Sequence, residues 1–332
     1  MAIYKEISPD QIKTAKSFLN QLVDVIQEDV SGSNTRRKYQ VFVTGGVGPG
    51  VTSSLFQTVY DQDFSLSTAN PIFDMTVGLY ESGSTVTNTQ TGIDSAGKLQ
   101  FPSSSLMMRE KVDIYRQFAQ SLLGNAGSSF YAPHDSTLAS DRIDNAMFIC
   151  FKRLFARDQI KRETFAMNFF MTASVTSLGG HGHGGHGIWD NIATTSTTGS
   201  AFFTDIGSAQ NKVTTFGGAV GSVVASHNTA IKTGLLFYDR GVLVLDLAKA
   251  ISGSQHCGGQ VDAVNADGKE AIGHPMSGSA QWNQYATFIP DFMTSGSIDN
   301  ILDHFATCRF SSGSNTAITF QNITNINSTL VF

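Results

Sequence analysis

The stretch TGLLFYDRGVLVLDL, residues 233–247, decides the fold class of the second half of the chain. Two runs rich in aliphatic and aromatic residues flank the short turn Asp239-Arg240-Gly241. Apolar runs of this length, joined by a turn that ends in glycine, are typical of a β-hairpin. The sequence therefore predicts two apolar strands joined by a tight turn.

The closing run TAITFQNITNINSTLVF, residues 316–332, alternates apolar residues with Asn, Thr and Ser. Alternation with a period of two is the pattern of a β-strand. Together with 233–247 it describes a sheet that is rich in hydroxyl and amide groups and carries very little charge. Such a surface suits contact with other protein better than contact with water or a small substrate.

These two segments resemble the C-terminal part of virion structural proteins of contractile-tailed phages, especially marine and cyanobacterial myoviruses. In that family a GL.FYD.G..VLD hairpin is followed by an FQN.T.INST..F run. The resemblance extends to 38–80 and 106–171, and it implies a tail or baseplate component of the virion, assembled in the host cytoplasm. The family often continues into a stretch rich in Cys and Asn, so the sequence leaves open whether the chain continues beyond Phe332.

Composition indicates a protein with few surface charges. The chain has 332 residues, of which 41% are hydrophobic and 15% are charged, against about a quarter charged in a typical soluble domain. Burial of much of the surface in an assembly would account for this. A surface built from Ser, Thr, Asn and Gln would account for it equally well, and both interpretations fit a virion.

Several classes of partner are not indicated. The net charge is −5 and the short basic runs are isolated, which argues against nucleic-acid binding through phosphate contacts. No apolar run reaches the roughly 18 residues that a membrane span needs. The start of the chain, MAIYKEISPD, lacks the apolar core of a signal peptide.

The overall pattern predicts an α+β fold in three parts. The first is a mixed α/β structural domain with three main helices, and the last is a β-rich assembly domain with hairpins. Between them lies a loop or linker rich in Gly, Ser, Thr and His. These parts are 1–176, 177–212 and 213–332.

The three helices are predicted from apolar residues that recur every three or four positions. The first, 9–30, begins with Ser8 as N-cap and Pro9 in the first turn. The other two cover about 105–123 and 141–156, and a short fourth helix covers 297–306. Strands are expected at 38–44, 72–80, 163–175, 216–226 and 285–289.

Residues 45–52, GGVGPGVT, come close to a phosphate-binding loop. Such a loop needs a lysine for the phosphates and a Ser or Thr for magnesium. Thr52 fits the second position, but Val51 occupies the lysine position and Pro49 removes a backbone donor. We therefore expect a structural turn here and no nucleotide site.

Three histidines lie close together in the glycine-rich segment 179–187. His181 and His183 are two residues apart and would point the same way on an extended chain, and His186 follows. In a trimer the pairs could place six imidazoles around the axis, as a site for Fe, Zn or Ni. The alternative, which we favour, is a flexible or partner-contacting loop, because ordering glycine costs entropy.

No other group of residues indicates catalysis. Cys150, Cys257 and Cys308 are far apart and read as reduced thiols, and the neighbours His256 and Cys257 would point in opposite directions on an extended chain. Asp141 and Asp144, with Glu110 and Asp113, read as solvated charges on helices. The cations Lys152, Arg153, Arg157, Lys161 and Arg162 form either a groove for an acidic neighbour or ordinary charges at a helix C-terminus.

We expect a structural subunit that catalyses no reaction and binds no cofactor. Its partners would be other virion proteins and further copies of itself, with the three- or six-fold symmetry that tail geometry implies. The uncharged strands would join neighbours by strand addition. The alternative is a receptor- or glycan-binding module associated with a fibre or spike.

Overall fold

The computed structural model describes residues 8–9, 12–26, 35–43, 51–87, 106–153, 156, 158–170, 200–226, 228–251, 289, 292–306 and 318–331. In β1 and in the outer part of β15 it is the backbone that is described. All statements below on what the molecule contains concern these ranges.

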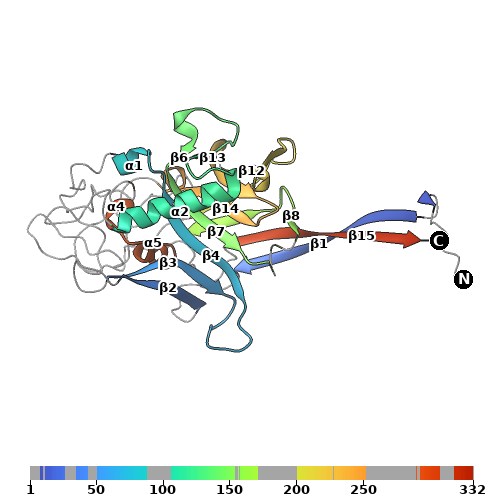
Figure 1. Ribbon diagram of the computed structural model, residues 1–332, viewed down its shortest axis with the longest axis horizontal. Coiled ribbons are helices and arrows are strands. Elements are labelled where there is room, and N and C mark those ends of the chain that lie inside the picture. The colour runs from blue at the N-terminus through green and yellow to red at the C-terminus, as the bar shows by residue number, and fades with distance from the viewer. Residues whose placement is uncertain are drawn as a thin grey trace, which may run out of the picture.

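One sheet of 13 strands dominates the molecule, and all of its paired strands run antiparallel. The path through the sheet is β1-β15-β9-β10-β12-β13-β14-β7-β4-β3-β2, with β11 beside β12 and β8 beside β15 (Figure 1). Its strands are β1 (Ile12–Ile26), β2 (Arg36–Val43), β3 (Val51–Tyr60), β4 (Pro71–Leu79), β7 (Asn145–Phe151), β8 (Gln159–Ile160), β9 (Ala166–Phe170), β10 (Ser200–Thr204), β11 (Val213–Thr215), β12 (Gly218–Ala225), β13 (Asn228–Phe237), β14 (Val242–Asp246) and β15 (Ile318–Val331).

The remaining elements are short, apart from one helix. β5 and β6 form a separate two-stranded sheet, and α2 and α5 pack against β4 and β3 of the main sheet. These elements are α1 (Ser84–Thr87), α2 (Leu106–Leu123), β5 (Phe130–Tyr131), the 3-10 helix η4 (Ala139–Asp141), β6 (Arg142–Ile143), α3 (Leu247–Ala250), α4 (Met293–Ser295) and α5 (Ile298–His304).

The hairpin predicted at 233–247 is confirmed and lies in the middle of the sheet. β13 and β14 pair from Phe237↔Val242 onward, and Gly241 makes the turn with φ of 63°, a conformation that glycine adopts without steric cost. β12 and β7 flank the hairpin. Every residue of β14 is buried, which explains why its sequence is apolar from Val242 to Leu245.

Aromatic side chains fill the space between α2 and the sheet. Phe118 of α2 stacks on Phe148 of β7, with ring centroids 4.0 Å apart. The Tyr115 hydroxyl donates to the Ile143 carbonyl at 2.7 Å and accepts from the Phe130 N–H at 2.9 Å. Gly78 permits this close approach, since a Cβ there would lie 2.9 Å from the Tyr115 nitrogen.

The predicted α+β fold with three main helices is wrong, because the molecule is β-dominated. The helix expected at 9–30 is the strand β1, and the helix expected at 141–156 contains the central strand β7. Pairing with β15, about 300 residues away in the chain, and with β4 and β14 outweighs local helical preference at these places. The helices expected at 105–123 and 297–306 are confirmed as α2 and α5.

The three-part division of the chain stays a prediction. The sheet joins strands from both 1–176 and 213–332, since β7 lies beside β14. Within 177–212, the described part begins with β10, which pairs with β9 and β12. The expected strand at 285–289 lies outside the described residues, except for Ile289.

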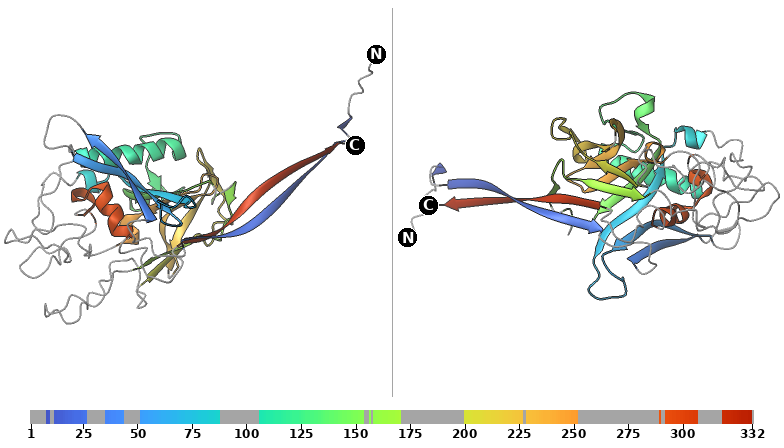
Figure 2. Two further views of the ribbon diagram at one scale, coloured as in Figure 1. Left: turned by 90° about the horizontal axis from the view of Figure 1, so that it is seen from below. Right: turned by 180° about the vertical axis from the view of Figure 1, so that it is seen from behind.

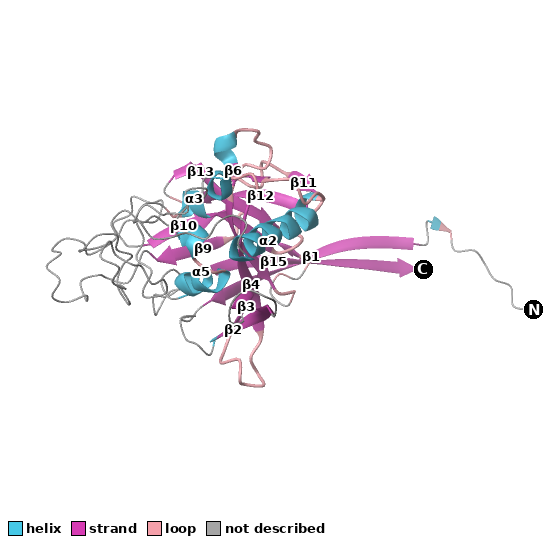
Figure 3. Ribbon diagram, turned by 60° about the vertical axis from the view of Figure 1, so that its left-hand side comes forward, coloured by secondary structure: helices cyan, strands magenta, loops and turns pink. Residues whose placement is uncertain are grey.

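The molecule consists of a body and a long arm. β1 and β15 leave the body side by side and project well beyond it, as all three views of the ribbon show (Figure 1, Figure 2). Helices α2, α3 and α5 lie on the body, whereas the projecting part consists of the two strands (Figure 3). The arm is therefore the part of the described molecule most available to a neighbour.

Candidate interaction arm

The arm is a two-stranded antiparallel ribbon. The register of β1 and β15 runs from Ile12↔Val331 at the tip to Ile26↔Ile318 at the base, with one shift between Asp24 and Ile26. At the base β15 also pairs with β8 and β9, through residues 318–323. In the described part of the chain, residues 324–331 pair with β1 alone, so both long edges of the ribbon are open.

The base of the arm is fixed firmly to the body. Phe320 is fully buried and its ring meets that of Phe151 edge-on, with centroids 5.0 Å apart. The Gln321 N–H donates to the Thr164 hydroxyl at 3.0 Å, and the Lys161 N–H donates to the Gln321 carbonyl at 2.7 Å. The direction of the arm is thus set by packing and hydrogen bonds on the body.

The β15 strand of the arm is poorly protected against pairing with another strand. Natural edge strands are usually guarded by charges, prolines or bulges, because their free N–H and C=O groups attract other strands. β15 has no charged residue and no proline, and β1 has only Lys13, Lys16 and Asp24. An isolated two-stranded ribbon is marginally stable in water. The arm therefore has the chemistry of a strand pair that is completed by a partner.

The opposite edge of the sheet, β2, is chemically different. It begins Arg36-Arg37-Lys38, and α5 holds two of these charges. Arg36 lies 2.6 Å from Asp303, and Lys38 lies 2.9 Å from Asp299 and 2.6 Å from Asp303. Burial would raise the pKa of Asp303, but hydrogen bonds from Lys38 and Gln57 and the nearby Arg36 outweigh it and lower that pKa. This edge is charged and braced, so the arm is the more receptive of the two edges.

Several residues predicted as sites lie outside the described residues. They include His181, His183 and His186, the Cys257–His256 pair, Cys308 and residues 45–50 of the near-miss phosphate loop. Where the structure describes the chain, no group of three or more His, Cys, Asp or Glu residues is arranged to hold a metal ion. Metal binding by the three histidines stays a prediction.

Three cations of the expected cluster have partners on the body, and a groove for an acidic neighbour stays a prediction. Lys152 pairs with Asp74, Arg153 lies 3.1 Å from Asp158, and the Arg162 guanidinium lies 4.4 Å from the centre of the Tyr238 ring. Because 145–151 is a strand, the explanation by helix C-terminal charges is wrong. Each of these cations contributes to local structure, and Arg157 lies outside the described residues.

The described cysteine and carboxylates also have structural surroundings. Burial, with the charge of Asp74, raises the pKa of the Cys150 thiol to about 12. Asp144 accepts from the Arg142 guanidinium at 2.6 Å, and Asp141 accepts from the Ser136 hydroxyl at 2.6 Å. The two carboxylates are held by separate donors.

Sequence reasoning missed a buried carboxylate, Asp205. It is fully buried and accepts hydrogen bonds from the Tyr238 hydroxyl at 2.8 Å, the Glu163 N–H at 2.8 Å, the Phe165 N–H at 3.0 Å and the Ser208 hydroxyl at 3.3 Å. Burial raises its pKa, and these four donors oppose the rise. Asp205 joins the end of β10 to the loop before β9 and to the end of β13. No sequence signal marks it, since its partners are distant in the chain.

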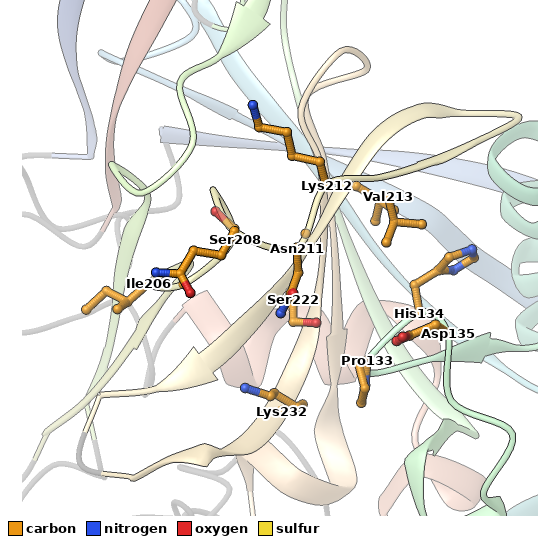
Figure 4. A pocket seen from close by; sticks show the side chains of 14 residues that line it. Pro133, His134, Asp135, Ile206, Ser208, Asn211, Lys212, Val213, Ser222 and Lys232 are labelled. Carbon is orange, nitrogen blue, oxygen red and sulfur yellow. The ribbon is translucent and has the colours of Figure 1, made fainter.

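An open pocket of about 520 Å³ lies beside this region. Loops at 133–135 and 206–213 line it, with residues of β12 and Lys232 (Figure 4). Its ionisable lining residues are His134, Asp135, Lys212 and Lys232, and the Lys232 ammonium already donates to the Thr229 carbonyl at 2.8 Å. The lining suits a small polar or anionic ligand.

Comparison with known proteins yields no relative: no family model, no curated protein and no solved structure matches the chain. Among the helices that the structure describes, none is long and apolar enough to cross a membrane.

Proposed function

We propose that this chain is a non-enzymatic structural subunit of a phage virion, in the tail or baseplate, and that it joins its neighbours through the β1·β15 arm. The observation that carries the proposal is the arm itself: two long strands, of which β15 is uncharged, that leave the body with open edges. Assembly of separate chains by strand addition uses such edges, because main-chain hydrogen bonds supply the affinity.

The body supplies the rigid base that such a connection needs. The central strands β14, β7 and β4 are almost entirely buried, and Phe320 and Gln321 join the arm to them through Phe151 and Lys161. A force on the arm is therefore passed to the middle of the sheet. The resemblance supplies the virion setting, and the three- or six-fold symmetry that it implies remains part of the proposal.

The test compares the full chain with a variant that starts at Leu19 and ends at Thr324, which are paired in the arm. This variant lacks the outer half of the ribbon and keeps its base. We expect the full chain to self-associate or to co-assemble with virion proteins in light-scattering experiments, and the shortened chain to remain monomeric with an unchanged urea midpoint of the body.

Any of four results would contradict the proposal. One is that the shortened chain assembles as well as the full chain, and another is that electron microscopy of intact particles finds the chain absent. The third is turnover of a substrate that is traced to its side chains. The fourth is a full chain that stays monomeric at high concentration and has no virion partner.

The pocket supports a second proposal, a receptor- or glycan-binding module. Lys212, Lys232 and His134 would contact an anionic sugar, and the amides of Gln210 and Asn211 would contact its hydroxyls. A glycan array probed with the full chain, beside a Lys212→Ala/Lys232→Ala variant, tests it. Binding that is lost in this variant supports the module, and no binding by the full chain rejects it.

A further inference from the structure

The charged residues of β1 face uncharged residues of β15 across the arm. In the register of the ribbon, Lys16 lies opposite Asn327 and Asp24 lies opposite Thr319. Cross-strand pairs of opposite charge stabilise an antiparallel ladder, and a charge set opposite a neutral residue gains no such contribution. In this register neither Lys16 nor Asp24 lies opposite a residue of the other charge.

A second copy of β1 can use it. When a strand pairs antiparallel with its own copy across a two-fold axis, one residue lies opposite itself and the others pair symmetrically about it. Lys16 and Asp24 are each four positions from Asn20. A contact centred on Asn20 therefore sets Lys16 of each copy opposite Asp24 of the other, so that two pairs of opposite charge form.

The same register also matches apolar residues. Phe18 and Leu22 are each two positions from Asn20, so they lie opposite each other twice. Moving the centre by one residue removes the match: about Leu19, Lys16 lies opposite Leu22. A register with Lys13 opposite Asp24 also pairs opposite charges, but no residue lies midway between these two. No residue then lies opposite its own copy, so that register is not two-fold. Of the two-fold contacts along β1, the one centred on Asn20 pairs its opposite charges.

We propose that β1 of one chain pairs antiparallel with β1 of a second copy, centred on Asn20, so that two arms form one four-stranded sheet in the order β15-β1-β1-β15. The proposal rests on the proposed function and adds its partner and register. It explains how a marginal two-stranded ribbon becomes stable, because four strands bury more surface and leave the edge of β1 paired. The contact is two-fold, and it joins copies in addition to any three- or six-fold contact.

Charge exchange tests the register in the full chain. Lys16→Asp and Asp24→Lys each set like charges opposite each other at both pairs, and we expect each to weaken self-association by about tenfold. A mixture of the two variants, and the double variant Lys16→Asp/Asp24→Lys, should recover it in sedimentation equilibrium. The matched control, Lys13→Asp, lies outside the charge pairs and should change self-association much less.

Cysteine cross-linking tests the centre of the contact. In a Cys257→Ser/Cys308→Ser background, Asn20→Cys places two thiols directly opposite, and oxidation should yield a disulfide-linked dimer on a non-reducing gel. Gln21→Cys is the control, because Gln21 would lie opposite Leu19. Equal yields for the two variants, or no cross-link with either, would overturn the register.

The two proposals fail in different ways. If removal of the outer arm abolishes assembly but mixing the charge variants restores nothing, the arm binds through another edge or to another protein. In that case the self-pairing is wrong and the structural-subunit proposal stands. If removal of the outer arm changes nothing, both are wrong.

Discussion

Replacement of Asp205 by alanine is the most direct test of how the body is held together. The carboxylate is fully buried and accepts from two backbone N–H groups and two hydroxyls. In Asp205→Ala the N–H groups of Glu163 and Phe165 and the Tyr238 hydroxyl lose their acceptor in a buried site. Each buried donor left without a partner costs about 1–3 kcal/mol.

The net loss is smaller than three such costs. Removal of the carboxylate also removes the cost of burying it, which is the cause of its raised pKa. We therefore expect Asp205→Ala to lower the free energy of unfolding by about 3–5 kcal/mol. Tyr238→Phe removes one of the four donors and should cost about 1 kcal/mol.

Urea denaturation followed by tryptophan fluorescence and circular dichroism measures these differences. The m-value should stay constant, so that the shift of the midpoint reports stability. Asp135→Ala serves as control, because Asp135 is exposed, and should stay within about 0.5 kcal/mol of the parent chain. A loss below about 1 kcal/mol for Asp205→Ala would refute the view that this carboxylate joins the strands.

Three further predictions concern the arm and two buried ionisable groups. Phe320→Ala empties a fully buried site against Phe151 and should cost about 3–5 kcal/mol in urea unfolding; a loss under about 1 kcal/mol would show that the arm is not anchored there. Burial raises the pKa of Asp246 to about 7, so between pH about 4 and about 7 the folded chain keeps a proton that the unfolded chain has lost. The free energy of unfolding should therefore fall as pH rises through this range, and Asp246→Asn should remove that slope. Burial lowers the pKa of Lys111 to about 7, so stability should rise between pH about 7 and about 10.5, and Lys111→Met should flatten that rise. Unfolding curves measured across pH for the parent chain and for both variants check the two signs. Slopes that the substitutions leave unchanged would contradict the assignments.

The two segments that were wrongly predicted as helices show where local sequence is ambiguous between helix and strand. In 12–26 the apolar residues at 12, 15, 18, 19, 22 and 26 satisfy a helical spacing, yet the segment is β1. In 145–151 the run NAMFICF is apolar after Asn145. A run that is buried on both faces has the same composition in a helix and in a central strand. What decided both was pairing with strands far away in the chain, which a local window does not contain.

The interaction arm, too, was predicted from the sequence only in part. The lack of charge in β15 is visible in the sequence and predicted a strand that contacts protein. The sequence does not predict that this strand projects as one half of an arm, because its partner, β1, is expected to be a helix. The charge network of Arg36, Lys38, Asp299 and Asp303 offered one signal, two acidic residues four positions apart on a predicted helix.

The sequence by itself determined the hairpin β13–β14, helix α2 and the uncharged strand β15, because each depends on periodicity, turn residues and composition within a short window. The tertiary structure alone decided the sheet order, the identity of β1 and β7 as strands, the burial of Asp205 and the existence of the arm. These depend on contacts between residues far apart in the chain. Backbone hydrogen bonds across strands can outweigh local preference at such places, since a buried N–H or C=O group must find a partner wherever the fold supplies one.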